Sequence, residues 1–389
     1  MQNRGSIRKL KKENTWQISF ELPKDELTGK RRRKYYTFHG SKKEAEKFKT
    51  QKLSELDNGI LKTTEKIKFV DYLNYWIETM ENMVKKTTIE GYKHYIDKHI
   101  KPAFNNVYLQ DLKKEHLQCF FNNKLKNGRL DGKGGLSSKT IKNIYVIVHQ
   151  VLEMAYNSDL INKNVSNGLK LPKVKKYEAN FLSKKPLMEI LEKSKGTEIY
   201  IPIALAIFTG MRRGEVLGLS WNNVDFENKI VKVEQQLQEI NGKLEITTPK
   251  TESSIREVYI PNIFVEILKR YKVEQDKRKL KLGKSYKNDI NAVCTYETGE
   301  LFNPKTFSRK FNRFLKKNNL PEIRYHDIRH SHASLLFSQN IQDKFISQRL
   351  GHSSTTTTKE IYTHLYEKDK KEVGKIIEKI FYNEERKAG

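Results

Sequence analysis

The sequence predicts a multidomain α+β protein: a small β-β-β-α unit, an all-α unit, and a larger, mainly α-helical unit that contains a three-stranded sheet. Three observations predict this arrangement. Apolar and polar residues alternate with a period of two over residues 15–22. The apolar period changes to three and four residues between about 63 and 172. Beyond residue 177, helical stretches surround short alternating runs between 229 and 261.

The composition predicts a polyanionic partner. The chain has 389 residues, enough for two or three domains with their own cores. Its 75 Lys and Arg outnumber its 47 Asp and Glu, which gives a formal net charge of +28. Nucleic acid is the commonest partner of such a surface. A solvated basic surface without function is the alternative.

The cysteine count and the apolar runs indicate the compartment. Two cysteines, Cys119 and Cys294, are too few for a disulfide framework. The polar, basic start does not fit a signal peptide, and no apolar run is long enough for a membrane span. We therefore expect a soluble, cytoplasmic protein that does not bind a membrane.

The N-terminal unit is predicted to be a basic sheet with a helix behind it. Residues 15–22 form one strand, and a turn at Thr28 and Gly29 leads into another. A helix follows with Ser41 as its N-cap and ends near Gly59. Such a sheet can enter a DNA groove, although a structural module with a solvated edge is the alternative. Four candidate DNA-binding residues lie at the entry of the second strand: Arg31, Arg32, Arg33 and Lys34.

The next unit is predicted to be a helical bundle. Apolar stripes indicate helices over residues 69–80, 89–100, 117–125 and 141–155, with a break at Pro102. We assign these stripes to the core. Four lysines on the polar faces are candidate phosphate contacts: Lys85, Lys86, Lys139 and Lys142. A basic linker, residues 169–181, then predicts a hinge.

The first chemical motif of the C-terminal unit follows an apolar helix over 199–208. Thr209 and Gly210 end that helix, and the next begins with Met211 and Arg212. An arginine is thereby placed within a turn of a helix end. Glu215 follows it by three positions and lies within reach as an orienting partner.

Three strands and a lysine are predicted next. The runs 229–237, 243–247 and 255–261 alternate as strands do, and Asn241–Gly242 is a hairpin signal. The turn between the last two runs presents Lys250. On its own, a lysine in a turn is usually a solvated charge.

The last motifs lie between residues 326 and 366. His326 and Arg329 are three positions apart, so both can approach one anionic group at the start of a helix. Gly351–His352 follows, and Tyr362 comes ten positions after His352. Tyr366 is a nearby alternative to Tyr362.

These motifs resemble, in order and spacing, those of the tyrosine recombinase (phage-type integrase) family: T-G-[LM]-R-x-[GS]-E, then H-x-x-R, L-G-H and a nucleophilic tyrosine. The resemblance covers essentially the whole chain and is most specific over 209–221 and 326–366. It implies an arm-type DNA-binding domain over 1–62 and a SAM-like core-binding domain over 63–172. A catalytic domain of the DNA breaking-rejoining enzyme fold would cover 173–389, including a C-terminal exchange helix.

The resemblance also implies a role for each motif. Arg212 and Arg329 would bind the non-bridging phosphate oxygens, because a guanidinium group binds phosphate oxygens in pairs. The remaining implied residues are His352 as a hydrogen-bond donor, Tyr362 as the nucleophile, His326 as the base, Lys250 as the acid, and Glu215 and His330 in support.

The implied activity is site-specific recombination through a covalent 3′-phosphotyrosine, which integrates and excises a mobile element or prophage. It would need neither metal nor ATP, and we expect no cofactor. The implied partners are double-stranded DNA at core and arm sites and further copies of the chain, assembled as a homotetramer through the C-terminal helix. An excisionase and a host DNA-bending protein are additional candidates.

Two other functions are alternatives to site-specific integration. A chromosome-dimer resolvase of the same family lacks the basic N-terminal module, and a non-cutting DNA-binding or architectural protein is the alternative from another class. The histidine pair His326 and His330 has zinc-binding spacing, but no H-E-x-x-H glutamate is present and Arg329 would repel a metal. The sequence has no phosphate-binding G-x-x-x-x-G-K-[ST] loop and no carboxylate cluster suited to two metals.

Overall fold

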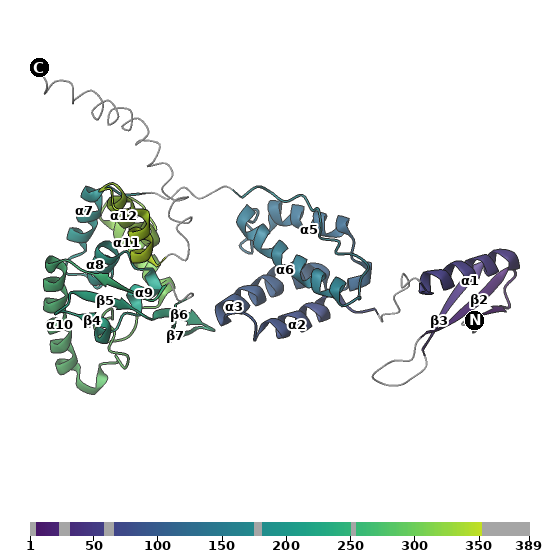
Figure 1. The fold of residues 1–389 in the computed structure, drawn as a ribbon, viewed down its shortest axis with the longest axis horizontal. Coiled ribbons are helices and arrows are strands. Elements are labelled where there is room, and N and C mark those ends of the chain that lie inside the picture. Colours follow the sequence, from purple (N-terminus) through teal and green to yellow (C-terminus); the bar gives the residue numbers. More distant parts are fainter. Residues whose placement is uncertain (1–4, 23–31, 58–65, 175–180, 250–253, 352–389) are drawn as a thin grey trace, which may run out of the picture. The chain divides into compact units, whose positions relative to one another are not determined.

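The structure is a computed structural model that describes residues 5–22, 32–57, 66–174, 181–249 and 254–351. Contacts divide the chain into two units, residues 1–175 and 176–389 (Figure 1). No helix of the described ranges is long and apolar enough to cross a bilayer.

The chain begins with the predicted β-β-β-α arrangement. Antiparallel strands β1 (Gly5–Lys9), β2 (Thr15–Leu22) and β3 (Arg32–His39) form one sheet with β2 in the centre. Helix α1 (Lys42–Asp57) covers one face of this sheet (Figure 1). The alternation of β2 directs Ile18 and Phe20 into a small core with Ala45. Ser41 and Glu44 cap the helix reciprocally, as the sequence predicts for Ser41.

A helical bundle follows. It consists of α2 (Phe69–Met80), α3 (Lys86–Tyr95), α4 (Lys101–Phe104), α5 (Lys114–Asn127) and α6 (Ser138–Asn157). The apolar stripes predicted from the sequence form its core, with Trp76, Phe121 and Val148 almost fully buried. Lys85, Lys86, Lys139 and Lys142 are all exposed. Short 3₁₀ turns occupy Leu109–Asp111 here, and Trp221–Asn223 and Gly283–Ser285 in the second unit.

The predicted break at Pro102 is wrong. The chain stays helical to Phe104, with a π-helical turn over Ile96–Ile100 in which the Lys101 N–H donates to the Ile96 carbonyl. Pro102, which has no N–H to donate, follows this π-helical turn directly and lies within the continuous helical stretch.

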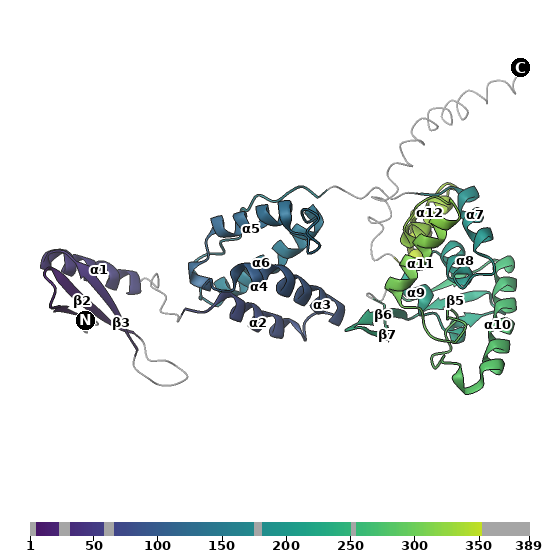
Figure 2. The same ribbon diagram turned by 180° about the vertical axis from the view of Figure 1, so that it is seen from behind.

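The second unit is built around the apolar helix α8 (Tyr200–Thr209). This helix packs against α7 (Lys184–Ser194), α9 (Arg213–Leu217), α10 (Asn262–Leu282) and α12 (Tyr325–Phe337), as Figure 2 shows. Strands β4 (Val224–Asp225), β5 (Ile230–Val233) and β8 (Arg256–Tyr259) form a three-stranded antiparallel sheet. Helices α11 (Pro304–Lys317) and α13 (Asp343–Leu350) complete the described part.

The predicted strand over 229–237 is two strands in different sheets. Its first half is β5, whereas its second half starts β6 (Gln236–Ile240), which pairs with β7 (Lys243–Thr247) and, among the described strands, with no other. The hairpin predicted at Asn241–Gly242 is confirmed, with φ of 50° and 75° at these residues. Strand β6 departs from the sheet because it packs on α9, where a Cβ at Gly218 would lie 2.5 Å from the Leu237 nitrogen.

Candidate active site

Arg212 and Glu215 meet as their spacing predicts. Gly210, with a φ of 70°, ends α8 and turns the chain so that Arg212 precedes α9. The Arg212 Nη1 donates to Glu215 Oε1 at 2.7 Å, and the Arg212 backbone N–H donates to Glu215 Oε2 at 2.8 Å. Glu215 thus caps α9 and orients the guanidinium group. Its side chain is 2% exposed, against 34% for Arg212.

Arg329 approaches the same region from α12. Its side chain is directed inward, and the residue is only 2% exposed. Nη1 donates to the Gly210 carbonyl at 2.8 Å, and Nη2 donates to the Leu350 carbonyl at 2.7 Å. The helix therefore fixes both the end of α8 and the end of α13.

The two arginines converge on the C-terminal turn of α13. Arg212 Nη2 donates to the Gly351 carbonyl at 2.7 Å, next to the Leu350 carbonyl that accepts from Arg329. Both guanidinium groups therefore hold the same turn, and both contribute to lowering the pKa of Glu215. The described chain ends at this turn, immediately before His352.

Two further arginines belong to this site, and sequence reasoning missed both. Arg256 donates to Glu215 Oε2 at 2.8 Å and to the Arg349 carbonyl at 2.6 Å. Arg349 itself donates to the Phe208 and Tyr259 carbonyls. The alternation of β8 could have indicated Arg256, because it shares a strand face with the buried Val258.

Glu215 is the acid among these cations. Burial raises its pKa, but Arg256, Arg212 and Arg329 outweigh this effect and lower the pKa to about 2. The carboxylate is therefore ionised at neutral pH. Three guanidinium groups against one carboxylate leave this cluster cationic.

His326 and His330 lie on the outer side of α12. Their rings meet edge to face, with centroids 5.0 Å apart. Burial, together with the positive charges of His330 and Arg329, lowers the pKa of His326 to about 4, although the side chain retains an exposed surface. Arg329 points inward, so only part of the predicted convergence with His326 is found. Within the described ranges, no three His, Cys, Asp or Glu side chains could hold a metal ion.

Several predicted residues lie outside the described ranges: Lys250, His352, Tyr362, the alternative Tyr366 and Arg31. Arg32 and Lys34 belong to β3, but their side chains are also outside the description. Arg33 pairs with Glu21 on the neighbouring strand at 2.5 Å. The roles predicted for all these residues stay predictions.

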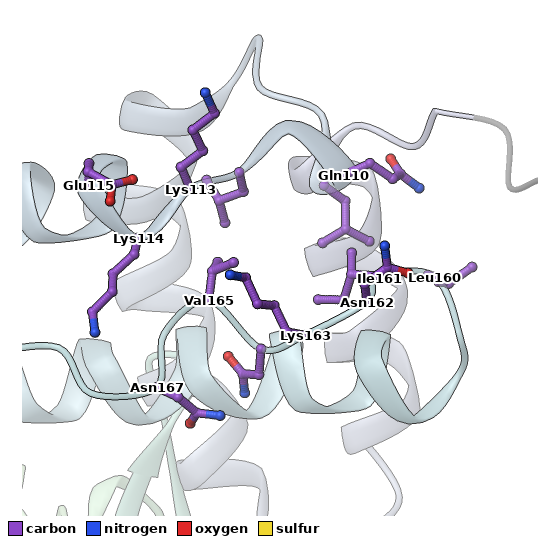
Figure 3. A pocket seen from close by; sticks show the side chains of 13 residues that line it. Gln110, Lys113, Lys114, Glu115, Leu160, Ile161, Asn162, Lys163, Val165 and Asn167 are labelled. Carbon is purple, nitrogen blue, oxygen red and sulfur yellow. The ribbon is translucent and has the colours of Figure 1, made fainter. Parts of the chain in front are cut away.

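The described surface also has hollows. One of about 910 Å³ lies in the helical bundle and is lined by lysine and amide side chains above an apolar floor. In Figure 3, Lys163 extends across it toward Val165, whereas Lys113 and Lys114 extend from its rim. Another hollow, of about 610 Å³, lies between α11 and the start of α12 and includes Arg309, Arg313 and Arg324. Only the second adjoins the helix that carries His326.

Comparison with known families agrees with this geometry. A family model described as the phage integrase family matches residues 181–369, and one described as the phage integrase N-terminal SAM-like domain matches residues 68–125. The chain belongs to the phage integrase family. As in other phage integrase family members, a helical SAM-like domain precedes the catalytic-type domain, which confirms the predicted fold class.

Relatives of this phage integrase family member cover nearly its full length. A tyrosine recombinase XerC-like protein of Caldanaerobacter subterraneus is 29% identical over 94% of this chain and 96% of its own. The ICEBs1 integrase of Bacillus subtilis is 27% identical over 96% of this chain and 100% of its own.

Among solved structures, the Tn1549 transposon integrase bound to transposon right-end DNA has a TM-score of 0.65 at 22% identity, covering 76% of this chain and 95% of its own. A lambda integrase dimer bound to a core site has a TM-score of 0.55 at 18% identity, over 92% and 94%. These two structures share the fold.

Proposed function

We infer that the chain is a site-specific tyrosine recombinase of the integrase kind, which cleaves and rejoins duplex DNA and so integrates and excises a mobile element. One observation carries this inference. In a member of the phage integrase family, Arg212 and Arg329 donate to the carbonyls of the adjacent residues Gly351 and Leu350, respectively, directly before His352. The integrases among the full-length relatives support the same conclusion.

The arginine pair suits the charge of the reaction. Attack on a phosphodiester concentrates negative charge on the non-bridging oxygens, and fixed cations stabilise that charge. The acceptors of Arg212 and Arg329 at α13 are neutral carbonyl groups. Arg212 also pairs with Glu215, but the positive charge of Arg212, Arg256 and Arg329 together exceeds that one carboxylate, so the cluster suits a phosphate. We assign the remaining hydrogen bond to that phosphate to His352.

The proposed cleavage transfers one phosphoryl bond. The Tyr362 oxygen attacks phosphorus, its proton passes to His326, and the bond from phosphorus to the deoxyribose 5′-oxygen breaks. Lys250 protonates the departing oxygen. His326, with a pKa near 4, is neutral at pH 7 and can accept a proton, and the negative charge of bound phosphate raises that pKa. A 5′-hydroxyl from a second duplex reverses the step, so neither ATP nor a metal is required. Glu215 and His330 orient Arg212 and His326.

The basic face of α11 supports duplex binding near this site. Phe307, Phe311 and Leu315 are buried, and the opposite, exposed face carries no acid. Its cations are Lys305, Arg309, Arg313, Lys316 and Lys317. Because three of these line the hollow beside α12, we propose that this face binds DNA phosphates.

We propose further contacts and partners on the sequence alone. Residues 1–62, with Arg31, Arg32, Arg33 and Lys34, would bind arm sites. Residues 63–172, with Lys85, Lys86, Lys139 and Lys142, would bind the core site. The catalytic domain, 173–389, would assemble as a tetramer through its C-terminal helix. An excisionase and a host DNA-bending protein are candidate partners.

A covalent trap tests the proposed function. The substrate is a nicked duplex copied from the DNA junctions of the element that encodes the chain. After denaturation, we expect a DNA adduct with the unaltered protein, none with Tyr362→Phe, and normal adduct with the matched control Tyr366→Phe. A chelator should not change the yield. An unaltered protein that binds this duplex without forming an adduct is a non-cutting DNA-binding protein, and the proposal is then wrong. Adduct at a single dimer-resolution site in the host chromosome would instead support the resolvase.

A further inference from the structure

Arg256 connects three segments of the catalytic unit. Its Nη2 donates to Glu215 in α9, and its Nε donates to the Arg349 carbonyl at the end of α13. Its Nη1 donates to the Ser254 carbonyl at 2.9 Å. The side chain is 6% exposed. A single planar group therefore holds all three acceptors.

Glu215 shares its two carboxylate oxygens between two arginines. Oε1 accepts from Arg212, and Oε2 accepts from Arg256. A carboxylate held on both sides cannot rotate without breaking one of these ion pairs. Oε2 also accepts from the Arg212 backbone N–H, so this N–H and Arg256 together set the direction in which Glu215 presents itself to the Arg212 guanidinium group.

Gly351 packs directly against Arg256. It adopts a φ of +68°, and a Cβ at this position would lie 3.0 Å from Arg256 Nη1 and 3.2 Å from its Cδ. The Gly351 carbonyl accepts from Arg212 on its other side. The turn that leads into His352 is thus held between Arg256 and Arg212.

We propose that Arg256 is a positioning residue for DNA cleavage, which aligns Arg212, through Glu215, with the turn at the end of α13. It donates to protein groups and is not itself assigned to the phosphate. The inference rests on the proposed function, because the alignment matters only if Arg212 binds the scissile phosphate. Arg256 also follows Lys250 closely in sequence, so the same anchor fixes the strand that leaves the lysine turn.

Single-turnover cleavage of the nicked duplex at saturating DNA tests this role. For Arg256→Met we expect a cleavage rate about 100-fold lower, the typical cost of a misplaced catalytic group, with DNA affinity nearly unchanged. For Arg256→Lys we expect a loss of about tenfold, since the three donors of an ammonium group sit on one nitrogen and cannot span acceptors that Nε, Nη1 and Nη2 reach from separate positions. Circular dichroism reports whether each variant is folded.

The pH profile separates positioning from mere structural support. Glu215 faces Arg212, Arg256 and Arg329. When Arg256→Met removes one of these charges, the buried carboxyl takes up a proton more easily, so cleavage should fall further between pH 7.5 and 5.5. Arg256→Lys keeps the charge and should retain the unaltered profile. Glu215→Gln combined with Arg256→Met should lose the added pH dependence.

Arg213 provides the matched control. It neighbours Arg212 but donates to Ser308 on α11, not to Glu215. Arg213→Met should therefore retain the unaltered pH profile. The inference is overturned if folded Arg256→Met cleaves at the unaltered rate, or cleaves slowly with an unaltered pH profile. If Arg256→Met does not fold, full activity of Arg256→Lys overturns it. Absence of any adduct with the unaltered protein would instead refute the proposed function.

Discussion

Arg349 Nε donates a hydrogen bond to His332 Nε2 at 3.2 Å, which fixes His332 as a neutral imidazole. Since Nε2 accepts, the ring proton lies on Nδ1, which donates to the Ile207 carbonyl at 2.7 Å. Burial, together with the positive charge of Arg349, lowers the pKa of His332 to about 4. Arg349 and His332 thus link α13 to the end of α8.

The neutral state of His332 predicts a loss of stability in mild acid. The unfolded chain takes up a proton near pH 6.5, whereas the folded chain does so only near 4. Stability from this residue is therefore complete above pH 6.5 and falls as the pH drops toward 4. At pH 5 the loss is about 2 kcal/mol. Urea unfolding at pH 7.5 and pH 5 measures it. His332→Asn should be less stable at pH 7.5 but show a smaller change between the two pH values, and an equal change would contradict this assignment.

Replacing Gly351 should cost stability for two separable reasons. Gly351→Ala forces a side chain into a left-handed conformation, at roughly 1–2 kcal/mol, and brings its Cβ against Arg256. Gly196→Ala is the matched control, because Gly196 has a φ of +72° and nothing within 4 Å of its Cβ. We expect a larger loss in the free energy of unfolding for Gly351→Ala, measured by urea titration. Equal losses would show that Arg256 moves aside freely.

Arg329→Lys keeps the positive charge but should still reduce both stability and DNA cleavage. The donors of a lysine sit on one nitrogen, whereas the Gly210 and Leu350 carbonyls are reached from two separate guanidinium nitrogens. We therefore expect one buried acceptor to be left without its donor, at a cost of about 1–3 kcal/mol. We also expect adduct formation to fall by about 100-fold or more. Thermal unfolding and the covalent trap measure the two effects. A variant with normal stability and normal adduct yield would remove Arg329 from the site.

The basic face of α11 should determine part of the salt dependence of DNA binding. Each phosphate contact that is lost should reduce the slope of log K against log salt by about 1. We expect this for Arg309→Gln and for Arg313→Gln, measured by fluorescence anisotropy between 50 and 200 mM salt, about the range in which such contacts dominate. Lys277→Gln, an exposed position on α10, is the control and should leave the slope unchanged. Slopes that do not differ would place α11 away from the duplex.

Local sequence rules predicted those parts of the site that depend on neighbours along the chain. The spacing of Arg212 and Glu215, the turn at Gly210 and the hairpin at Asn241–Gly242 all follow from helix and turn geometry. The division of residues 229–237 into two strands does not, because it depends on how closely β6 approaches α9.

Tertiary contacts could not be predicted in this way. Arg256 and Arg349 belong to none of the motifs quoted above. Each donates to carbonyl groups that are distant in sequence and come close only in the fold. Likewise, a three-residue spacing placed His326 and Arg329 near one another on α12 but could not show that Arg329 turns inward while His326 remains at the surface.

The shared carboxylate of Glu215 also constrains how this sequence can evolve. Loss of Glu215 leaves Arg256 as a buried charge without its counter-ion, and loss of Arg256 leaves Glu215 with less compensation than it needs. Such a break typically costs about 3–5 kcal/mol, a large part of the stability of an ordinary domain. A single substitution that removes the charge at position 215 or 256 therefore passes through a destabilised intermediate. In descendants of this sequence, the two residues should be inherited or replaced together.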